Sequence, residues 1–348
     1  MSIIKIGKKI IGTNHPCYII AEIGSNFDGN LKKAKRLIKL AKESGADCAK
    51  FQAFKTEKIL SKKGFEKKST FQSKWKKSVW TVYEEAEFNR LWISELSKYS
   101  KKLGIDFMVT PYDYEAVDVL SSAKIPAFKI GSGDITFLEL LKYIAKTKKP
   151  ILLGTGASNM EEIKRAISTI KSCNNNKIIL LQSITQYPSS INDANILSML
   201  ELKNKFNLDV GYSDHSPGIS VPLASVALGA CVIEKHFTDN KKNIGPDHPH
   251  SLTPIEFSQM VSGIREVEMA LGSSHKKVVT SEKDTRIIQR RSIFTITSVK
   301  KGEKLNKNNI DCLRPCIGLP ASDFTKILNK HAKKDLEPYT AISKSDFY

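Results

Sequence analysis

The sequence predicts a parallel (β/α)8 barrel followed by a small β-rich domain, and two features of the pattern support this. Short apolar runs alternate with amphipathic stretches through about the first 270 residues, and the alternation then stops. Eight such runs occur, which is the number of strands in a barrel of about 250 residues. A doubly wound open sheet is the alternative architecture for the same alternation.

The eight predicted strands are rich in Ile, Val, Leu and Phe, and most are bounded by polar or glycine-containing turns. They lie at 17–24, 47–52, 106–111, 127–133, 150–156, 178–183, 208–213 and 231–237. Between them, apolar residues recur three and four positions apart, which is the period of a helix with one buried face. The clearest helical stretches are 31–44, 88–104, 115–123, 137–147 and 160–172.

The chain is predicted to divide into a barrel at 1–271, a linker at 272–286 and a β-rich module at 287–348. The linker is polar and has no hydrophobic period. The module reads as short strands, turns and one short helix around 322–330. Because a core of this size is marginal on its own, we expect the module to dock on the barrel or on a second chain.

Composition places the protein among globular chains, with 41% hydrophobic and 26% charged residues. No segment reaches the roughly 20 continuous apolar residues of a membrane span, and Lys5, Lys8 and Lys9 interrupt the apolar run at the N-terminus. We therefore expect a cytoplasmic protein that does not engage a membrane. The six cysteines are scattered, which favours reduced thiols over disulfides or a zinc site.

The formal net charge of +19 raises the question of nucleic-acid binding. Lysines greatly outnumber arginines, however, and they are spread along the whole chain together with Asn and Ile. Contacts to bases and phosphates favour arginine, because its planar guanidinium binds in a bidentate manner. The charge therefore indicates a compositional bias and, at most, a small anionic substrate, with no nucleic-acid partner.

Two histidines each follow a predicted strand, His215 in GYSDHSPG and His236 in CVIEKHFTDN, and GPDHP follows at 245–249. If both strands end at the same mouth, the two imidazoles converge there. Imidazole binds divalent metal ions, and a shell with only two protein ligands leaves positions open for substrate. The alternative is that each is a hydrogen-bonded loop histidine, but their pairing favours the metal.

Polar side chains are concentrated at the ends of the predicted strands, where barrels of this class place their active sites. The set comprises Glu22, Asn26, Lys50, Gln52, Thr110, Tyr112, Asp113, Lys129, Ser132, Thr155, Ser183, Thr185, Tyr187, Asp214, His215, Glu234 and His236. Lys50 and Lys129 stand inside apolar runs, where an unpaired charge is costly. They must bind a substrate anion or form salt bridges to Glu22 or Glu234.

Glycine-rich turns follow the fourth and fifth predicted strands, GSGD at 131–134 and GTGAS at 154–158. Such turns can present successive backbone N–H groups near a helix start, a geometry that binds phosphate. Glycine also serves tight connections between strands and helices, so the turns alone are weak evidence. Together with Lys50 and Lys129 they favour a pocket for phosphate or carboxylate.

Several motifs together resemble those of the N-acetylneuraminate (sialic acid) synthase family. They are AEIGSNFDG (21–29), GADCAKFQ (45–52), KIGSGD (129–134), TQYP (185–188), GYSDHSPG (211–218), EKHFT (234–238), GPDH (245–248), RRSIF and KKGEKL. The resemblance covers nearly the whole chain. It implies a TIM barrel followed by an antifreeze-like SAF domain of β-clip type, and a domain-swapped homodimer that uses Mn²⁺ or Mg²⁺.

The resemblance also implies a reaction, the condensation of phosphoenolpyruvate with an open-chain aldose to a nine-carbon 2-keto acid and phosphate. By this resemblance His215 and His236 hold the metal, and Lys50, Thr110, Lys129 and Ser132 bind phosphoenolpyruvate. The remaining family positions lie near the sugar and the reacting carbons; they are Glu22, Gln52, Tyr187, Asp247 and Arg314. Glu22, grouped with the two histidines as catalytic, either positions water or assists proton transfer. Arg314 is expected to reach the partner subunit's site.

Three departures from the family pattern bear on the sugar: Phe27 replaces a common His, LLQSITQYP replaces a His-Cys-Thr form, and RPCIGLP replaces an RPGTGI-like run. The acceptor is therefore open between N-acetylmannosamine, a diacetamido-trideoxy hexose leading to legionaminic or pseudaminic acid, and a related aldose. Two other classes of function also remain open. One is a metal-dependent aldolase or deoxy-sugar-phosphate synthase, and the other is a non-catalytic binding protein derived from an enzyme.

Overall fold

The computed structural model describes residues 3–67, 72–73 and 75–348. The chain divides into two compact units, Met1–Gly272 and Ser273–Tyr348. Each unit has its own hydrophobic core.

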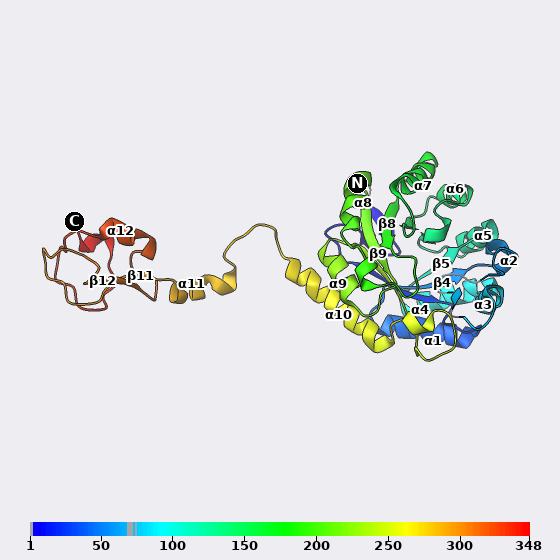
Figure 1. Ribbon diagram of the computed structural model, residues 1–348, viewed down its shortest axis with the longest axis horizontal. Coiled ribbons are helices and arrows are strands. Elements are labelled where there is room, and N and C mark those ends of the chain that lie inside the picture. Colours follow the sequence, from blue (N-terminus) through cyan, green and yellow to red (C-terminus); the bar gives the residue numbers. More distant parts are fainter. Residues whose placement is uncertain (1–2, 68–71, 74) are drawn as a thin grey trace. The chain divides into compact units, whose positions relative to one another are not determined.

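Eight parallel strands form the centre of the first unit within its described residues (Figure 1). They are β3 (Tyr18–Gly24), β4 (Cys48–Ala53), β5 (Asp106–Pro111), β6 (Phe128–Ile130), β7 (Ile151–Gly154), β8 (Ile178–Ser183), β9 (Asp209–Asp214) and β10 (Val232–His236). Their spatial order is β5-β4-β3-β10-β9-β8-β7-β6, and β5 and β6 at its two ends also contact each other. The sheet is therefore a nearly closed barrel, which confirms the predicted fold over the open sheet.

Helices cover the outside of this barrel (Figure 1). They are α1 (Leu31–Glu43), α4 (Ile93–Leu103), α5 (Tyr114–Ser122), α6 (Leu138–Lys146), α7 (Met160–Ser172), α8 (Ser198–Phe206), α9 (Ser220–Ala227) and α10 (Pro254–Leu271). Each packs one apolar face on the strands; α7, for example, buries Ile163, Ala166, Ile167 and Ile170. α10 starts with a capping box between Thr253 and Glu256, which satisfies free backbone donors at that end. Two additional short helices, α2 (Thr56–Ile59) and α3 (Val79–Ala86), follow β4.

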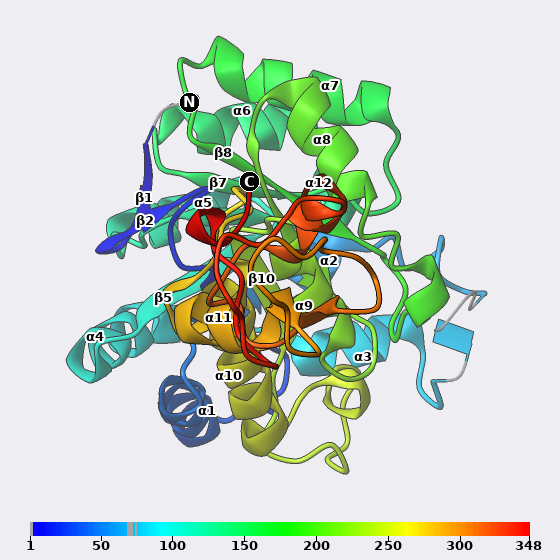
Figure 2. The same cartoon turned by 90° about the vertical axis from the view of Figure 1, so that its left-hand side faces the viewer.

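An N-terminal hairpin, which the sequence pattern did not predict, precedes the barrel. Its strands β1 (Ile4–Ile6) and β2 (Lys9–Ile11) pair antiparallel and lie side by side (Figure 2). Ile4, Ile6 and Ile11 are buried against residues inside the barrel, including Tyr18 and Ile20 near the start of β3. The hairpin therefore covers the end of the barrel opposite the carboxyl ends of the strands.

The second unit contains α11 (Lys283–Gln289), an antiparallel pair of strands, β11 (Ser292–Thr295) and β12 (Ile310–Leu313), and the short helix α12 (Phe324–Ile327). Its core is a cluster of aliphatic side chains that includes Ile293, Val299, Leu305 and Ile342. Helix α12 falls where the sequence predicted a short helix. Helix α11 lies partly within the segment predicted as a linker, since its residues 283–286 belong to both.

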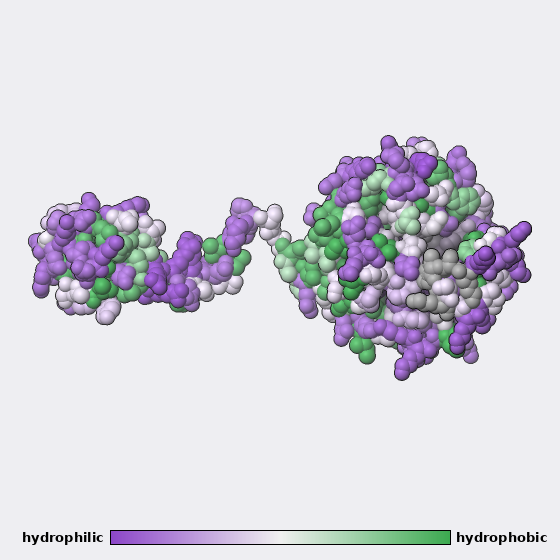
Figure 3. Space-filling model, viewed as in Figure 1, coloured by the Kyte–Doolittle hydropathy of each residue, from purple (hydrophilic) through white to green (hydrophobic). Residues whose placement is uncertain are grey.

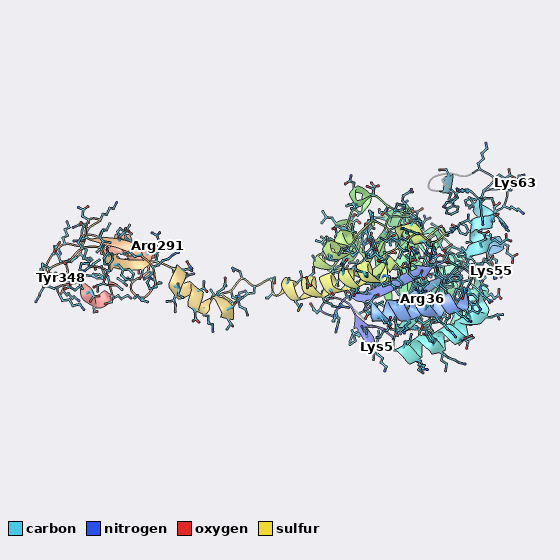
Figure 4. All side chains as sticks on the ribbon, turned by 90° about the horizontal axis from the view of Figure 1, so that it is seen from below. Lys5, Arg36, Lys55, Lys63, Arg291 and Tyr348 are labelled. Atoms are coloured by element: carbon cyan, nitrogen blue, oxygen red, sulfur yellow. The ribbon has the colours of Figure 1, made fainter. Side chains whose placement is uncertain are left out.

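The surface of each unit is largely hydrophilic on the face in view (Figure 3). Basic side chains are spread rather than gathered; Lys5, Arg36, Lys55 and Lys63 lie at separate places on the first unit (Figure 4). Among the described residues, every helix is too short or too polar to span a membrane.

Candidate active site

A small cavity lies at the carboxyl ends of the barrel strands, and ionisable and hydroxyl side chains line it. The lining comprises Glu22, Lys50, Gln52, Thr110, Tyr112, Lys129, Gly131, Ser132, Ser183, Tyr187, Ser213, His215, Glu234 and His236. All seven predicted catalytic and phosphoenolpyruvate-binding residues belong to it, because the parallel strands end at one mouth. Burial of so many polar groups in one place is costly, which favours a functional site over a structural one.

Two lysines and two glutamates form a buried charge network at the base of this cavity. Lys50 Nζ lies 2.6 Å from Glu22 and 3.7 Å from Glu234, and Lys129 Nζ lies 2.6 Å from Glu234. All four side chains are at most 6% exposed. The salt bridges that the sequence left as an alternative for both lysines are therefore present. The two positive and two negative charges cancel, so an anion that binds here adds negative charge to a network that is already balanced.

The two carboxyl groups of the network differ in pKa. Burial raises the pKa of Glu22, and the nearby Lys50 only partly opposes that effect. Burial would also raise the pKa of Glu234, but Lys129 and Lys50 outweigh it and lower this pKa to about 2. Glu234 is thus the fixed anion of the network, and Glu22 is the carboxyl group better able to exchange a proton.

Hydrogen bonds from neighbouring strands fix the orientation of these groups. Gln52 donates to Glu22 over 2.7 Å, and Lys50 donates to Thr110 over 3.1 Å. Ser213, which the sequence did not single out, donates to Glu234 over 3.0 Å. The side chains therefore occupy defined positions, as catalysis requires of groups that must meet a substrate.

His215 and His236 lie close together, with ring centroids 5.5 Å apart. His215 Nδ1 lies 2.7 Å from the carbonyl oxygen of Ile184, which fixes the tautomer that leaves Nε2 free. Burial lowers the pKa of His215 to about 4 and that of His236 well below its usual value. Both rings are therefore neutral, which is the form that binds metal ions. Tyr187 packs on His215 at a centroid distance of 4.2 Å.

The loop that follows β10 brings two further groups to His236. Asp247 Oδ2 accepts hydrogen bonds from the backbone and the hydroxyl of Ser25, and Asp247 Oδ1 lies 4.0 Å from His250 Nε2. The His236 and His250 ring centroids are 4.7 Å apart. Gly24 makes room for this arrangement, since it has φ +55° and a Cβ at this position would lie 2.5 Å from Asp247 Oδ2.

Buried nitrogen atoms without hydrogen-bond partners identify where a metal ion fits. Within the described part of the chain, His236 Nδ1 and His250 Nε2 are such atoms. An unpaired buried nitrogen costs free energy unless a ligand satisfies it. The imidazole-rich mouth therefore suits the divalent cation that the sequence predicted.

The two glycine-rich turns differ in their relation to the cavity. Gly131 and Ser132 line it, whereas the backbone N–H of Gly156 donates to Ser132 Oγ over 3.0 Å. A Cβ on Gly156 would lie 2.4 Å from Thr185 Oγ1. The first turn is thus placed to contact an anion, and the second holds Ser132 in position.

A second cavity of about 330 Å³ adjoins the first and shares Gln52, Tyr112, Tyr187 and His236 with it. Its other walls are mostly apolar and come largely from α2, α3 and their flanking segments. They comprise Ser25, Phe54, Ile59, Trp75, Val82, Tyr83, Ala86, Pro188, Pro246, Asp247, Pro249 and His250. Asp247 lines this outer cavity and not the first one, and its predicted role in binding the sugar stays a prediction.

Phe27, one of the three departures from the family pattern, lines neither cavity. Its side chain is fully buried and packs against Phe51, Phe88 and Trp92, with centroid distances of 5.5 to 6.0 Å. The Phe27 side chain is thus part of the core between the barrel and its helices.

Arg314 lies in the second unit, directly after β12, and is exposed. Its guanidinium forms no ion pair with any residue that the structure describes. Its predicted role at the site of a partner subunit stays a prediction.

Sequence reasoning missed two groups of this site. Ser213 was not considered, and His250 lay one residue beyond the motif GPDHP; Glu234 was recognised at a strand end, but its only suggested role was as a partner for the lysines. The signal for His250 was the repeat His-Pro-His at 248–250. His248 itself is structural, since its two ring nitrogens lie 2.6 Å from Thr238 Oγ1 and 2.8 Å from Asp28 Oδ1.

The fold and the cavity define the class of the protein, a barrel enzyme whose ionisable groups gather at the carboxyl ends of its strands. Within that class, the chain belongs to the NeuB family, whose model matches residues 37–276. A SAF domain model matches residues 290–347. Both matches confirm the family that the motifs indicated, and the SAF match confirms the predicted type of the second domain.

Three known proteins illustrate the relationship. An uncharacterized protein of Methanocaldococcus jannaschii is 43% identical over 97% of this chain and 96% of its own length. The N,N'-diacetyllegionaminic acid synthase of Campylobacter jejuni is 42% identical over 91% of this chain and 96% of its own. The crystal structure of the N-acetylneuraminic acid synthetase of Leptospira borgpetersenii, in complex with citrate, has a TM-score of 0.74 and 32% identity, covering 82% of this chain and 95% of that chain.

Proposed function

We propose that this protein condenses phosphoenolpyruvate with an N-acetylated open-chain aldose, giving a nine-carbon 2-keto sugar acid and phosphate. The observation that carries the proposal is the cavity itself. Lys50, Thr110, Lys129 and Ser132, the family's positions for phosphoenolpyruvate, line one space with Glu22 and the two histidines. Ammonium and hydroxyl groups suit the phosphate and carboxylate of phosphoenolpyruvate, because charge-assisted hydrogen bonds are the strong ones.

The reaction forms one carbon–carbon bond and breaks one carbon–oxygen bond. The methylene carbon of phosphoenolpyruvate attacks the aldehyde carbon of the aldose, and the aldehyde oxygen takes a proton to become a hydroxyl. Water adds at the carbon that bears the phosphate, and phosphate leaves with the bridging oxygen. Lys50 and Lys129 hold the anionic groups, and Glu22 positions the water or moves its proton.

A divalent cation at the imidazole-rich mouth would polarise the aldehyde oxygen toward attack. The chain's own contribution there is the neutral state of the imidazoles and the position of Tyr187, whose ring packs on His215. Burial also raises the pKa of Tyr187, so its hydroxyl keeps its proton and can donate to a sugar oxygen.

Within the class of N-acetylated aldoses, we propose a diacetamido-trideoxy hexose as the preferred acceptor over N-acetylmannosamine. The outer cavity presents Phe54, Trp75 and Val82, and these apolar walls suit methyl and acetyl groups better than free hydroxyls. The relative named as a diacetyllegionaminic acid synthase, at 42% identity, supports the same acceptor.

The proposed enzyme is a homodimer in which Arg314 of one chain meets the acceptor held by the other. Two features of the second unit support this. Arg314 is exposed, and Ile287, Ile288 and Ile317 expose between 50% and 65% of their surface. Exposed aliphatic residues on a small domain are a common sign of a protein interface.

The test is phosphate release from phosphoenolpyruvate in the presence of Mn²⁺ or Mg²⁺ and each of a panel of aldoses, with the product mass read in the same reaction. We expect release with a diacetamido-trideoxy hexose, a smaller kcat/KM with N-acetylmannosamine, and no release with sugar phosphates. Release only with phosphorylated sugars would indicate a deoxy-sugar-phosphate synthase. Cleavage of the keto acid without phosphoenolpyruvate would indicate an aldolase.

A further inference from the structure

Aromatic side chains that directly follow two barrel strands form one wall of the outer cavity. Phe54 comes straight after β4, and Tyr112 comes straight after β5. Their rings meet edge to face with centroids 5.8 Å apart, and Tyr83 of α3 packs on Phe54 at a centroid distance of 5.4 Å. All three rings line the cavity, so its shape on this side depends on how the two strand ends are held.

Arg90 holds these two strand ends together. Its guanidinium donates to the carbonyl oxygen of Ala53 over 2.8 Å and also forms an ion pair with Asp113. Ala53 immediately precedes Phe54, and Asp113 immediately follows Tyr112. A guanidinium presents several donors in one rigid plane, which suits it better than an ammonium group to fix both ends at once.

The groups of this contact are themselves held in place. The Arg90 side chain is only 8% exposed, and a second ion pair joins it to Glu115 of α5 over 3.0 Å. Phe88, two residues before Arg90, is fully buried. Asp113 Oδ1 accepts a hydrogen bond from the backbone N–H of Ala116 at the start of α5. The contact therefore joins fixed elements of the barrel.

The family's positions for phosphoenolpyruvate are held by other contacts. Lys50 and Thr110 lie inside the strands, where β4 and β5 pair residue by residue. Arg90 reaches only the last of these pairs, Ala53 with Pro111, and the residues beyond it. Loss of Arg90 should therefore displace the wall of the outer cavity and leave the pairing of the two strands intact.

We propose that Arg90 is a positioning residue for the acceptor. By holding the ends of β4 and β5, it sets the positions of Phe54 and Tyr112 and hence the fit of the aldose. The inference rests on the proposed function, because it takes the outer cavity as the place where the aldose binds. Arg90 lines neither cavity, so it acts through the residues beside it. Its loss should lower the affinity for the aldose and leave the affinity for phosphoenolpyruvate unchanged.

The test measures binding without turnover, by calorimetric titration of the full chain in the presence of phosphoenolpyruvate and Mn²⁺. The probe is the alditol of the diacetamido-trideoxy hexose, which has no aldehyde and cannot react. We expect Arg90→Gln to weaken alditol binding about tenfold and to change phosphoenolpyruvate binding by less than about twofold. Arg90→Lys keeps the charge and should show an intermediate affinity. In steady-state assays with the aldose itself, the KM for the aldose should rise by a larger factor than kcat falls.

Arg265→Gln is the matched control. Arg265 also forms an ion pair, with Glu268, and donates to a backbone carbonyl, that of Cys17 just before β3, at the opposite end of the barrel. This variant should lose stability in urea, as Arg90→Gln does, and should bind the alditol as the parent does.

Parental alditol affinity in folded Arg90→Gln would overturn the inference, as would equal losses of alditol and phosphoenolpyruvate affinity. Equal weakening in Arg265→Gln, or a parent that does not bind the alditol, would overturn it as well. If the parent bound both ligands but released no phosphate with the aldose, the proposed reaction would fail, and weaker alditol binding in Arg90→Gln would still support the inference.

Discussion

At the scale of single residues, the buried charges at the base of the cavity bear on both the proposed reaction and the stability of the fold. Glu234 is 5% exposed and faces Lys129, Lys50 and Ser213. Such a group is stable only while its partners remain, because an uncompensated buried charge costs several kcal/mol. The residues that we propose to bind substrate anions are therefore also structural.

We predict that Lys129→Met lowers the free energy of unfolding by about 3 kcal/mol and abolishes turnover. The substitution keeps the length of the side chain but leaves Glu234 with one positively charged partner among the described residues, Lys50 at 3.7 Å. Urea unfolding measures the change. The double variant Lys129→Met, Glu234→Gln should recover much of the stability and none of the activity. If the single variant were as stable as the parent, the network would not have the predicted structural role.

A second prediction concerns Asp134, in the turn after β6. Burial raises its pKa from 3.8 to about 6. The folded protein then binds more protons than the unfolded chain between about pH 4 and pH 6, so this group's contribution to stability falls as pH rises through that window. Asp134→Asn removes the charge. It should be more stable than the parent by about 2 kcal/mol at pH 7.5, after allowance for solvent screening, and equally stable near pH 4.

Urea unfolding at the two pH values tests this prediction. An equal difference at both pH values would show that the substitution acts through packing and not through the carboxyl group. A parent more stable at pH 7.5 than the variant would show that ionised Asp134 has a favourable partner.

At the scale of elements, the loop after β3 and the loop after β10 depend on each other. Ser25 binds Asp247, Asn26 binds Ser251, and Gly24 leaves space for the Asp247 carboxylate. The site therefore depends on contact between two segments more than 200 residues apart in sequence.

We predict that Gly24→Ala disrupts the site more than it disrupts the fold. Alanine at φ +55° costs about 1 kcal/mol, and its Cβ would displace Asp247. Gly29→Ala is the matched control, with φ +63° and no atom within 4 Å of the added Cβ. Both variants should lose stability in urea, Gly24→Ala somewhat more because Asp247 also loses its hydrogen bonds to Ser25, and only Gly24→Ala should lose phosphate release. Equal activity in the two variants would contradict the role given to Gly24.

At the scale of the whole molecule, the proposed dimer can be tested by combining two defective variants in one dimer. The variant His236→Ala should be inactive because its barrel site is defective. The variant Arg314→Ala should have lower activity because its second domain is defective. If Arg314 acts across the dimer, a mixed dimer contains one complete site. Co-expression of the two chains should then restore up to about a quarter of the parental activity, measured as phosphate release. If mixed dimers form and no activity returns, Arg314 acts at the site of its own chain or outside any site.

Sequence patterns alone were enough to predict the class of fold, the strands of the barrel and most residues that line the candidate site. Local patterns carry that information: a buried strand is a short apolar run, a surface helix repeats every three to four residues, and the carboxyl end of each strand is marked by the next polar residue. His215 and His236 could be found because each stands at such an end, and Lys50 and Lys129 because each interrupts an apolar run.

The contacts between these residues, and the groups that surround them, follow from the three-dimensional fold. It placed Phe27 in the core, paired both lysines with Glu22 and Glu234, and brought His250 to His236 and Asp247. The N-terminal hairpin also escaped the sequence pattern, because strands of three residues are too short to show a period. The physical reason is common to all of these cases, since contacts between distant segments depend on distances that no local pattern records.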